Sequence, residues 1–126
     1  METSELGGLQ VRALLDEDRA CPFQQWYNAL RDRTARSRII IRLLRMEQGN
    51  FGDHRERISG TISELRLDYG PGYRIYYVRH GKSLIVLLGG GTKEGQQRDI
   101  EACTALWERN KADVERLSRD YRSGLV

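Results

Sequence analysis

The spacing of hydrophobic residues changes three times along the chain and divides it into four sections. Alternating apolar residues over 9–15 predict a strand. Apolar residues three and four positions apart then predict a helix that begins near Pro22 and a second helix over about 33–48. The glycines and polar residues of 49–53 are typical of the turn that ends a helix.

The third section returns to alternation and predicts a small antiparallel β-sheet. Three strands are expected, over 62–69, 73–77 and 84–88. The segment 54–58 fits either a short edge strand or a structured loop. The run 84–88 is uniformly apolar, which is typical of a central strand covered on both faces.

The strands on either side of residues 70–72 are expected to form a hairpin, and a three-residue connection would place Tyr69 opposite Tyr73. Period-two geometry then divides the side chains into two sets, Leu65, Leu67, Tyr73, Ile75 and Tyr77 on one face and Arg66, Asp68, Arg74 and Tyr76 on the other. Arg66 and Arg74 therefore share one face, within one or two cross-strand positions of each other. We expect both guanidinium groups to emerge together into solvent without acidic partners.

The last section has apolar residues at helical spacing over 100–121 and predicts one long amphipathic helix, with Thr92 as a candidate N-cap. Residues 1–8 are expected to be flexible, and 108–126 form a charged helical extension. The β-α-α-β-β-β-α order predicts a single α+β domain over 1–126. We expect its helices to pack on one face of the antiparallel sheet.

The composition fits one soluble globular domain. The chain has 126 residues, of which 31% are charged and 39% hydrophobic. No apolar run approaches the roughly 18 to 20 residues of a membrane span, and the polar, acidic start does not resemble a signal peptide, so we expect a cytoplasmic protein. Cys21 and Cys103 are expected to be free thiols, and the two histidines are too few for a typical zinc site. We therefore expect neither a metal nor a cofactor.

Positive charge is concentrated in one segment. The formal net charge of the whole chain is +3, whereas residues 31–45 hold six arginines against the single acid Asp32. Arg38, Arg42 and Arg45 lie on one side of the predicted second helix. A run of charged residues is usually a solvated helix face. The density and one-sidedness of this stripe make a surface for RNA or the ribosome an equal alternative.

Several ordered motifs resemble a known family. They are Ser63-Glu64-Leu65-Arg66, Gly70-Pro71-Gly72-Tyr73-Arg74-Ile75-Tyr76-Tyr77 and Leu87-Leu88-Gly89-Gly90-Gly91-Thr92-Lys93. Over about residues 9–107 the chain resembles the phage-derived addiction-module killer proteins, HigB-like toxins of the RelE/ParE superfamily. Thr92 stands where these proteins usually carry an aspartate.

The resemblance implies a bacterial toxin whose partner is a cognate helix-turn-helix antitoxin. RelE- and HigB-like relatives cut messenger RNA on the ribosome, whereas ParE-like relatives inhibit DNA gyrase with the same scaffold. Three functions therefore stay open: a ribosome-dependent endoribonuclease, a gyrase inhibitor, and a non-catalytic protein that only binds its antitoxin. The pairing of Arg66 with Arg74 favours the first, because a gyrase inhibitor needs no phosphate-shaped charge cluster.

Metal-free RNA cleavage needs a base for the ribose 2′-hydroxyl, charge stabilisation at the phosphate and a proton for the leaving oxygen. Arginine suits the second task because its planar fork binds two phosphate oxygens. The catalytic candidates are Arg74, Arg66, Lys93 and His54. The candidates for RNA binding are Arg38, Arg42, Arg45 and Tyr76, the last by stacking on a base or carrying a proton.

Each candidate also has a purely structural interpretation. Arg66 and Arg74 can form cross-strand ion pairs with Glu64 and Asp68, and Lys93 can be a solvated residue at a helix start. His54 can be a loop histidine without a role. The glycine run 89–91 lacks P-loop spacing and is expected to be a tight strand-to-helix turn.

Overall fold

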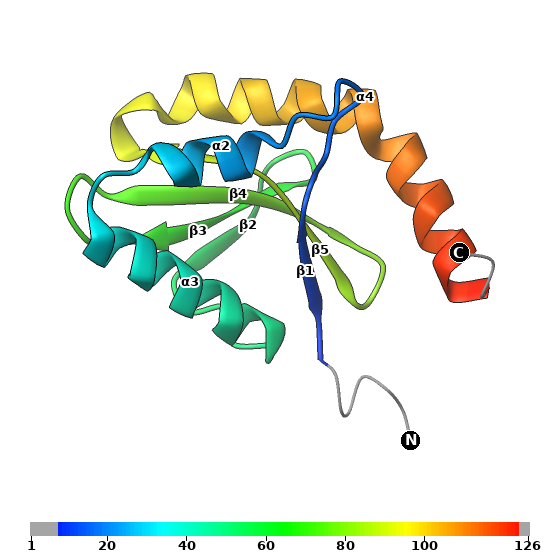
Figure 1. Cartoon of the computed structure of the whole chain (residues 1–126), viewed down its shortest axis with the longest axis horizontal. Helices are drawn as coiled ribbons and strands as arrows, with labels where there is room; N and C mark the ends of the chain where they lie inside the picture. The colour runs from blue at the N-terminus through cyan, green and yellow to red at the C-terminus, as the bar shows by residue number, and fades with distance from the viewer. Residues whose placement is uncertain (1–7, 124–126) are drawn as a thin grey trace.

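The computed structural model describes residues 8–123, with side chains up to residue 118, and has a five-stranded sheet between helices (Figure 1). Its elements are β1 (Gln10–Ala13), α2 (Pro22–Ala29), α3 (Arg33–Glu47), β2 (His54–Ser59), β3 (Ile62–Leu67), β4 (Tyr73–His80), β5 (Leu84–Thr92), a 3₁₀ turn (Lys93–Gly95) and α4 (Gln96–Ser123). The α+β class is confirmed. The flexibility expected of residues 1–7 lies outside the described residues.

The sheet is mixed rather than antiparallel. Its strand order is β1-β5-β4-β3-β2, and β1 runs parallel to β5 while the remaining neighbours are antiparallel. The segment 54–58, expected to be either an edge strand or a loop, lies in the edge strand β2. The helices are therefore followed by four strands and not only by the three that were expected. The expectation of a wholly antiparallel sheet is therefore wrong at β1.

The two N-terminal helices form as their sequences predict. Pro22 occupies the first turn of α2, where its missing N–H removes no hydrogen bond. Asp32 caps α3, because its side chain accepts hydrogen bonds from the backbone N–H groups of Thr34 (2.9 Å) and Ala35 (3.2 Å). Helix α3 then buries Ala35, Ile39 and Met46 against the sheet.

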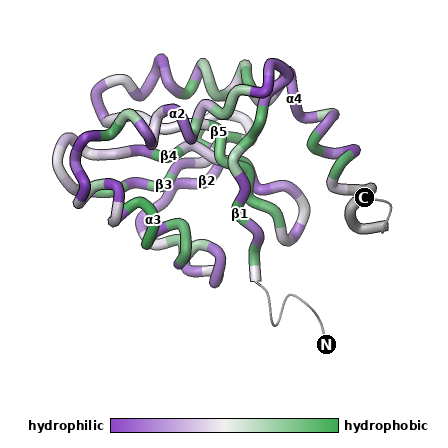
Figure 2. Tube along the Cα trace, viewed as in Figure 1, coloured by the Kyte–Doolittle hydropathy of each residue, from purple (hydrophilic) through white to green (hydrophobic). Residues whose placement is uncertain are grey.

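Helices cover both faces of the sheet, so the expectation of a single covered face is wrong. Helices α2 and α3 pack on the face that carries Leu65, Ile75 and Tyr77. Helix α4 packs on the opposite face, where Cys103 and Trp107 belong to a second core cluster. Figure 2 shows hydrophobic residues in the strands between these helices, as expected for a sheet with two buried faces.

The β3–β4 hairpin differs from the expected one in register but not in faces. Leu67 pairs with Tyr73 and Arg66 pairs with Arg74, so the connection spans residues 68–72 instead of 70–72. Gly70 and Gly72 have φ of +56° and +83°, values that favour glycine in this turn. Because the pairing shifts by an even number of residues, the paired residues 65–67 and 73–77 keep their predicted faces, whereas Asp68 lies in the connection and outside the strands.

The glycine run 89–91 lies inside β5 and is not a turn. Its small residues allow close packing from both sides: the indole of Trp26 in α2 lies against Gly90, and the carboxylate of Asp99 in α4 lies against Gly91. Thr92 makes no side-chain capping hydrogen bond, so its expected N-cap role is also wrong. Helix α4 begins at Gln96, after the 3₁₀ turn.

Candidate functional site at one end of the sheet

Three cationic residues lie near one another where β3 ends and β4 begins. Arg66 lies directly opposite Arg74 in the register, and both point to the face that α4 covers. Lys93 follows β5 on the neighbouring side, and Gly72 lies against both the Lys93 side chain and a terminal nitrogen of Arg74. Arg66, Arg74 and Lys93 are called the cationic cluster below.

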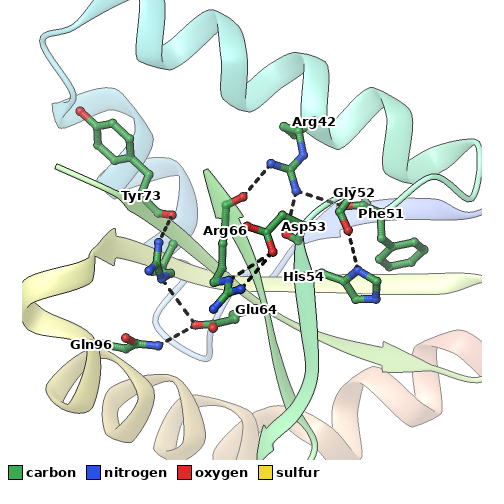
Figure 3. Close-up of polar contacts among 10 residues, drawn as sticks. Arg42, Phe51, Gly52, Asp53, His54, Glu64, Arg66, Tyr73 and Gln96 are labelled. Carbon is green, nitrogen blue, oxygen red and sulfur yellow. Dashed lines mark hydrogen bonds and ion pairs between the residues drawn. The ribbon is translucent and has the colours of Figure 1, made fainter. Parts of the chain in front are cut away.

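Both arginines of this cluster have acidic neighbours. Arg66 donates hydrogen bonds from Nε and Nη2 to Oδ1 of Asp53, at 3.3 and 3.1 Å (Figure 3). Arg74 Nε lies 3.9 Å from Oε1 of Glu64, and the Arg74 side chain is only 11% exposed. The expectation that both guanidinium groups emerge unneutralised is therefore wrong. The alternative of ion pairs holds, with Asp53 in place of Asp68 as the partner of Arg66.

The reason for this burial is the position of α4. Its first residue, Gln96, donates a hydrogen bond of 2.7 Å from its side-chain amide to Oε1 of Glu64, which is fully buried (Figure 3). Tyr76, opposite Glu64 on β4, is also fully buried. Burial, and then the charge of Glu64, raises the pKa of Tyr76 well above its usual value. The expected stacking of Tyr76 on an RNA base is therefore wrong, because the buried ring offers no free face.

Glu64, Arg74 and Tyr76 form a buried polar cluster with unsatisfied groups. Glu64 Oε2, Arg74 Nε and the Tyr76 hydroxyl have no hydrogen-bond partner among the described residues. An unsatisfied buried polar group costs about 1–3 kcal/mol, so such groups are rare and call for an explanation. Nearby, burial also raises the pKa of Asp99, against the effect of Arg98. These unsatisfied groups lower the stability of the fold. They lie near the exposed Lys93 and the half-buried Arg66.

His54 lies on the other face of the sheet. It pairs with Leu65, whose side chain belongs to the core under α2 and α3, and its ring centroid is 5.3 Å from that of Phe51. Its Nδ1 is 2.9 Å from the carbonyl oxygen of Gly52, and its Nε2 is 3.5 Å from Glu56. The structure therefore does not bring His54 together with the cationic cluster.

The arginines of α3 form a separate basic groove of about 420 Å³ beside the end of β3. The guanidinium of Arg38 lies over the ring of Tyr69, 4.5 Å from its centroid. Arg42 donates hydrogen bonds to the carbonyl oxygens of Arg66 (2.7 Å), Phe51 (3.0 Å) and Asp53 (2.9 Å), as Figure 3 shows. Arg42 therefore has a structural role, because its guanidinium group already donates hydrogen bonds to three backbone carbonyls.

Arg45 is exposed and lines the same groove, with Ile41 from α3 and Asp68 from the hairpin. The basic groove is connected to the cationic cluster through Arg42, which holds the backbone of both Asp53 and Arg66. These contacts bring the two charged surfaces to one end of the molecule. The cation–π contact with Tyr69 holds Arg38 in place and does not neutralise its positive charge.

Sequence reasoning named Glu64 as a possible ion-pair partner but missed Asp53, which pairs with Arg66, and Gln96, which donates a hydrogen bond to Glu64. The uniformly apolar run 84–88 already indicated a strand covered on both faces, and it pointed to a helix on the arginine face as well. Among the described residues no group of three or more His, Cys, Asp or Glu side chains is placed to hold a metal ion. Within the same part of the chain, no helix is both long and apolar enough to cross a membrane.

The fold and the site define an α+β protein with a mixed five-stranded sheet, a buried polar cluster and two adjoining cationic surfaces. No protein-family model matches the chain. A protein of Haemophilus influenzae, described only as an uncharacterized protein, is 38% identical over 84 residues, which are 67% of this chain and 84% of that protein. The chain belongs to the same family as this Haemophilus influenzae protein.

Proposed function

We propose that the chain is the toxin of a bacterial type II toxin–antitoxin module. In this proposal it acts in the cytoplasm as a metal-independent, cofactor-free endoribonuclease that cleaves messenger RNA on the ribosome and blocks translation. The order of motifs over about 9–107 supports the family of the proposal. The observation that carries the chemistry is the direct pairing of Arg66 with Arg74, with Lys93 beside them.

The ion pair of Arg66 is compatible with phosphate binding. The Arg66 side chain is 34% exposed and that of Asp53 is 52% exposed. Pairs this accessible contribute only about 0–1 kcal/mol, so a phosphate can replace Asp53 at modest cost. In the proposed complex Arg66 binds the phosphate through its fork, and the exposed Lys93 adds a second positive charge.

Arg74 supplies positive charge from behind these two groups. Its Nη1 donates a hydrogen bond of 3.1 Å to the carbonyl oxygen of Tyr73, which fixes the guanidinium on the sheet. A fixed charge in a partly buried site stabilises a developing negative charge more effectively than a solvated one. Because His54 is on the other face, the protonated Lys93 donates the proton to the leaving oxygen in this proposal, and the ribose 2′-hydroxyl loses its proton to water.

Cleavage of a defined transcript tests the proposal. The chain is induced in growing bacteria, and primer extension maps breaks in a reporter message. We expect cleavage with the wild type, at least a tenfold loss with Arg66→Ala, Arg74→Ala or Lys93→Ala, and no loss with the control Arg12→Ala. Arg12 is exposed on β1, at the other end of the strand order. Intact messages during growth arrest would contradict the proposal, and relaxed or cleaved plasmid DNA in the same cells would indicate gyrase inhibition instead.

A second candidate function is a member that binds its antitoxin without cleaving RNA. The low exposure of Arg74 and the acidic neighbour of each arginine favour it. This candidate predicts neither cleavage nor growth arrest in the wild type, with antitoxin binding retained. The transcript assay combined with co-purification of the antitoxin separates it from the nuclease.

A further inference from the structure

Helix α3 leaves three large aliphatic side chains in solvent. Ile40, Ile41 and Leu44 are 41%, 46% and 53% exposed. Helical periodicity brings them to one ridge, on the side away from Ile39 and Met46, which are fully buried. Ile40, Ile41 and Leu44 are called the α3 ridge here. Figure 2 shows hydrophobic segments alternating with hydrophilic ones along this helix.

The ridge is contiguous, which separates it from ordinary surface exposure. Single exposed aliphatic residues are common and need no explanation, but a contiguous exposed apolar patch points to an interaction surface. The other strongly exposed aliphatic residues of the described chain are Leu15, in the connection between β1 and α2, and Leu117 on α4, which line one pocket away from α3. Leu117 therefore offers a matched comparison on α4.

The surroundings of the ridge are positively charged. Arg33, Arg38 and Arg45 are exposed on α3, whereas its one acidic residue, Glu47, is partly buried. Ile41 belongs to the ridge and also lines the basic groove with Arg38 and Arg45. Apolar and cationic surfaces are thus continuous, and both come from a single rigid helix.

We propose that the α3 ridge and the adjoining basic groove are the docking site for an acidic amphipathic helix of a protein partner. Apolar residues of that helix at three- and four-residue spacing would cover Ile40, Ile41 and Leu44. Carboxylates beside them would pair with Arg38 and Arg45 at the rim. The aliphatic ridge favours a protein over RNA, because Ile and Leu offer RNA neither stacking rings nor phosphate contacts.

This inference rests on the proposed function, in which the protein partner is the antitoxin. Its helix would occupy the basic groove next to the cationic cluster, since Arg42 joins α3 to the backbone of both Asp53 and Arg66. A docked acidic helix would therefore compete with RNA for Arg38 and Arg45. Inhibition would then follow from occupation of this groove.

The test measures the affinity of the purified full-length chain for its purified cognate antitoxin by isothermal titration calorimetry. We expect Ile41→Glu and Leu44→Glu each to weaken binding by about 30-fold or more, as is typical of central interface residues. Arg38→Glu with Arg45→Glu should weaken it by a similar factor. Leu117→Glu, a change at an equally exposed leucine on α4, should bind within about twofold of the wild type, and thermal unfolding of each variant checks its folding.

The outcomes distinguish this inference from the proposed function. Wild type that binds the antitoxin, with all α3 variants binding equally well, overturns the docking site and leaves the toxin–antitoxin assignment intact. The docking site is also overturned if the α3 variants lose messenger RNA cleavage but keep antitoxin affinity, because the surface would then serve RNA. Wild type that fails to bind the antitoxin overturns both.

Discussion

The side-chain amide of Gln96, the first residue of α4, donates a 2.7 Å hydrogen bond to the fully buried carboxylate of Glu64 on β3. This contact connects the start of the last helix to the strand that carries Arg66. The same carboxylate lies 3.9 Å from Arg74 Nε. One acidic group therefore holds α4 in place and balances the least exposed arginine of the cationic cluster.

Removing this carboxylate should destabilise the protein. We expect Glu64→Ala to lower the free energy of unfolding by about 2–4 kcal/mol, because Arg74 would remain buried without its counter-charge. Glu64→Gln keeps an oxygen for the Gln96 amide and should cost less than Glu64→Ala. Urea denaturation gives both values, and Glu115→Ala on the exposed side of α4 provides the control with an expected change within about 0.5 kcal/mol. A Glu64→Ala variant as stable as that control would contradict the proposed counter-charge role.

The burial of Glu64 shows which parts of the fold could be predicted from the sequence and which could not. Alternation placed Arg66 and Arg74 on one face, and an error of two residues in the hairpin register left that face unchanged. The apolar run 84–88 was correctly interpreted as a strand covered on both faces. The expectation of helices on one face contradicted that interpretation, and it left the arginine face in solvent.

Other features depend on contacts between distant segments and leave no periodic signal. Arg42 occupies the helix stripe expected to bind RNA, yet its side chain donates to three backbone carbonyls. The glycine run 89–91 has the composition of a turn, but its role is to accept side chains from α2 and α4. Which neighbour packs on a glycine is decided by tertiary structure, so local sequence could not predict it.

Tyr76→Phe should change the pH dependence of stability. Burial, and then Glu64, raises the pKa of Tyr76 above its usual value of 10.0, so the folded protein favours the neutral phenol. The corresponding stability is complete below pH 10 and is lost as the pH rises above it toward the folded-state pKa. We expect the phenylalanine variant to lose less stability than the wild type between pH 9 and pH 11, by up to about 1.4 kcal/mol per pH unit.

At pH 7 the same variant should be as stable as the wild type or more stable by about 1 kcal/mol, since the Tyr76 hydroxyl has no hydrogen-bond partner among the described residues. Urea midpoints at each pH measure both effects. A residual alkaline loss is expected, because burial also raises the pKa of Tyr77 and of Cys103 to about 12. Identical pH profiles for the two proteins would contradict the assignment.

Gly90→Ala should test the packing of α2 on β5. A methyl group at this position would overlap the indole of Trp26, and we expect a loss of about 1–3 kcal/mol in urea denaturation. In a Trp26→Leu background the same substitution should cost at least about 0.5 kcal/mol less, because the smaller side chain leaves room for the methyl group. Equal costs in both backgrounds would show that the alanine acts elsewhere.

Asp53→Asn should separate the two roles considered for Arg66. The substitution removes the negative charge that faces Arg66 but keeps the backbone carbonyl that accepts from Arg42. Because the pair is partly exposed, we expect a stability change below about 1 kcal/mol. If Arg66 binds phosphate, its guanidinium becomes more available, and affinity for a single-stranded RNA should rise several-fold in fluorescence anisotropy at low salt.

The control for this measurement is Asp113→Asn, which removes an exposed carboxylate on α4 and should raise RNA affinity little. Arg66→Ala in the Asp53→Asn background should abolish the gain, since the gain depends on the released guanidinium. An Asp53→Asn variant with unchanged RNA affinity would mean that the ion pair with Arg66 serves the fold alone, and it would favour the non-catalytic candidate.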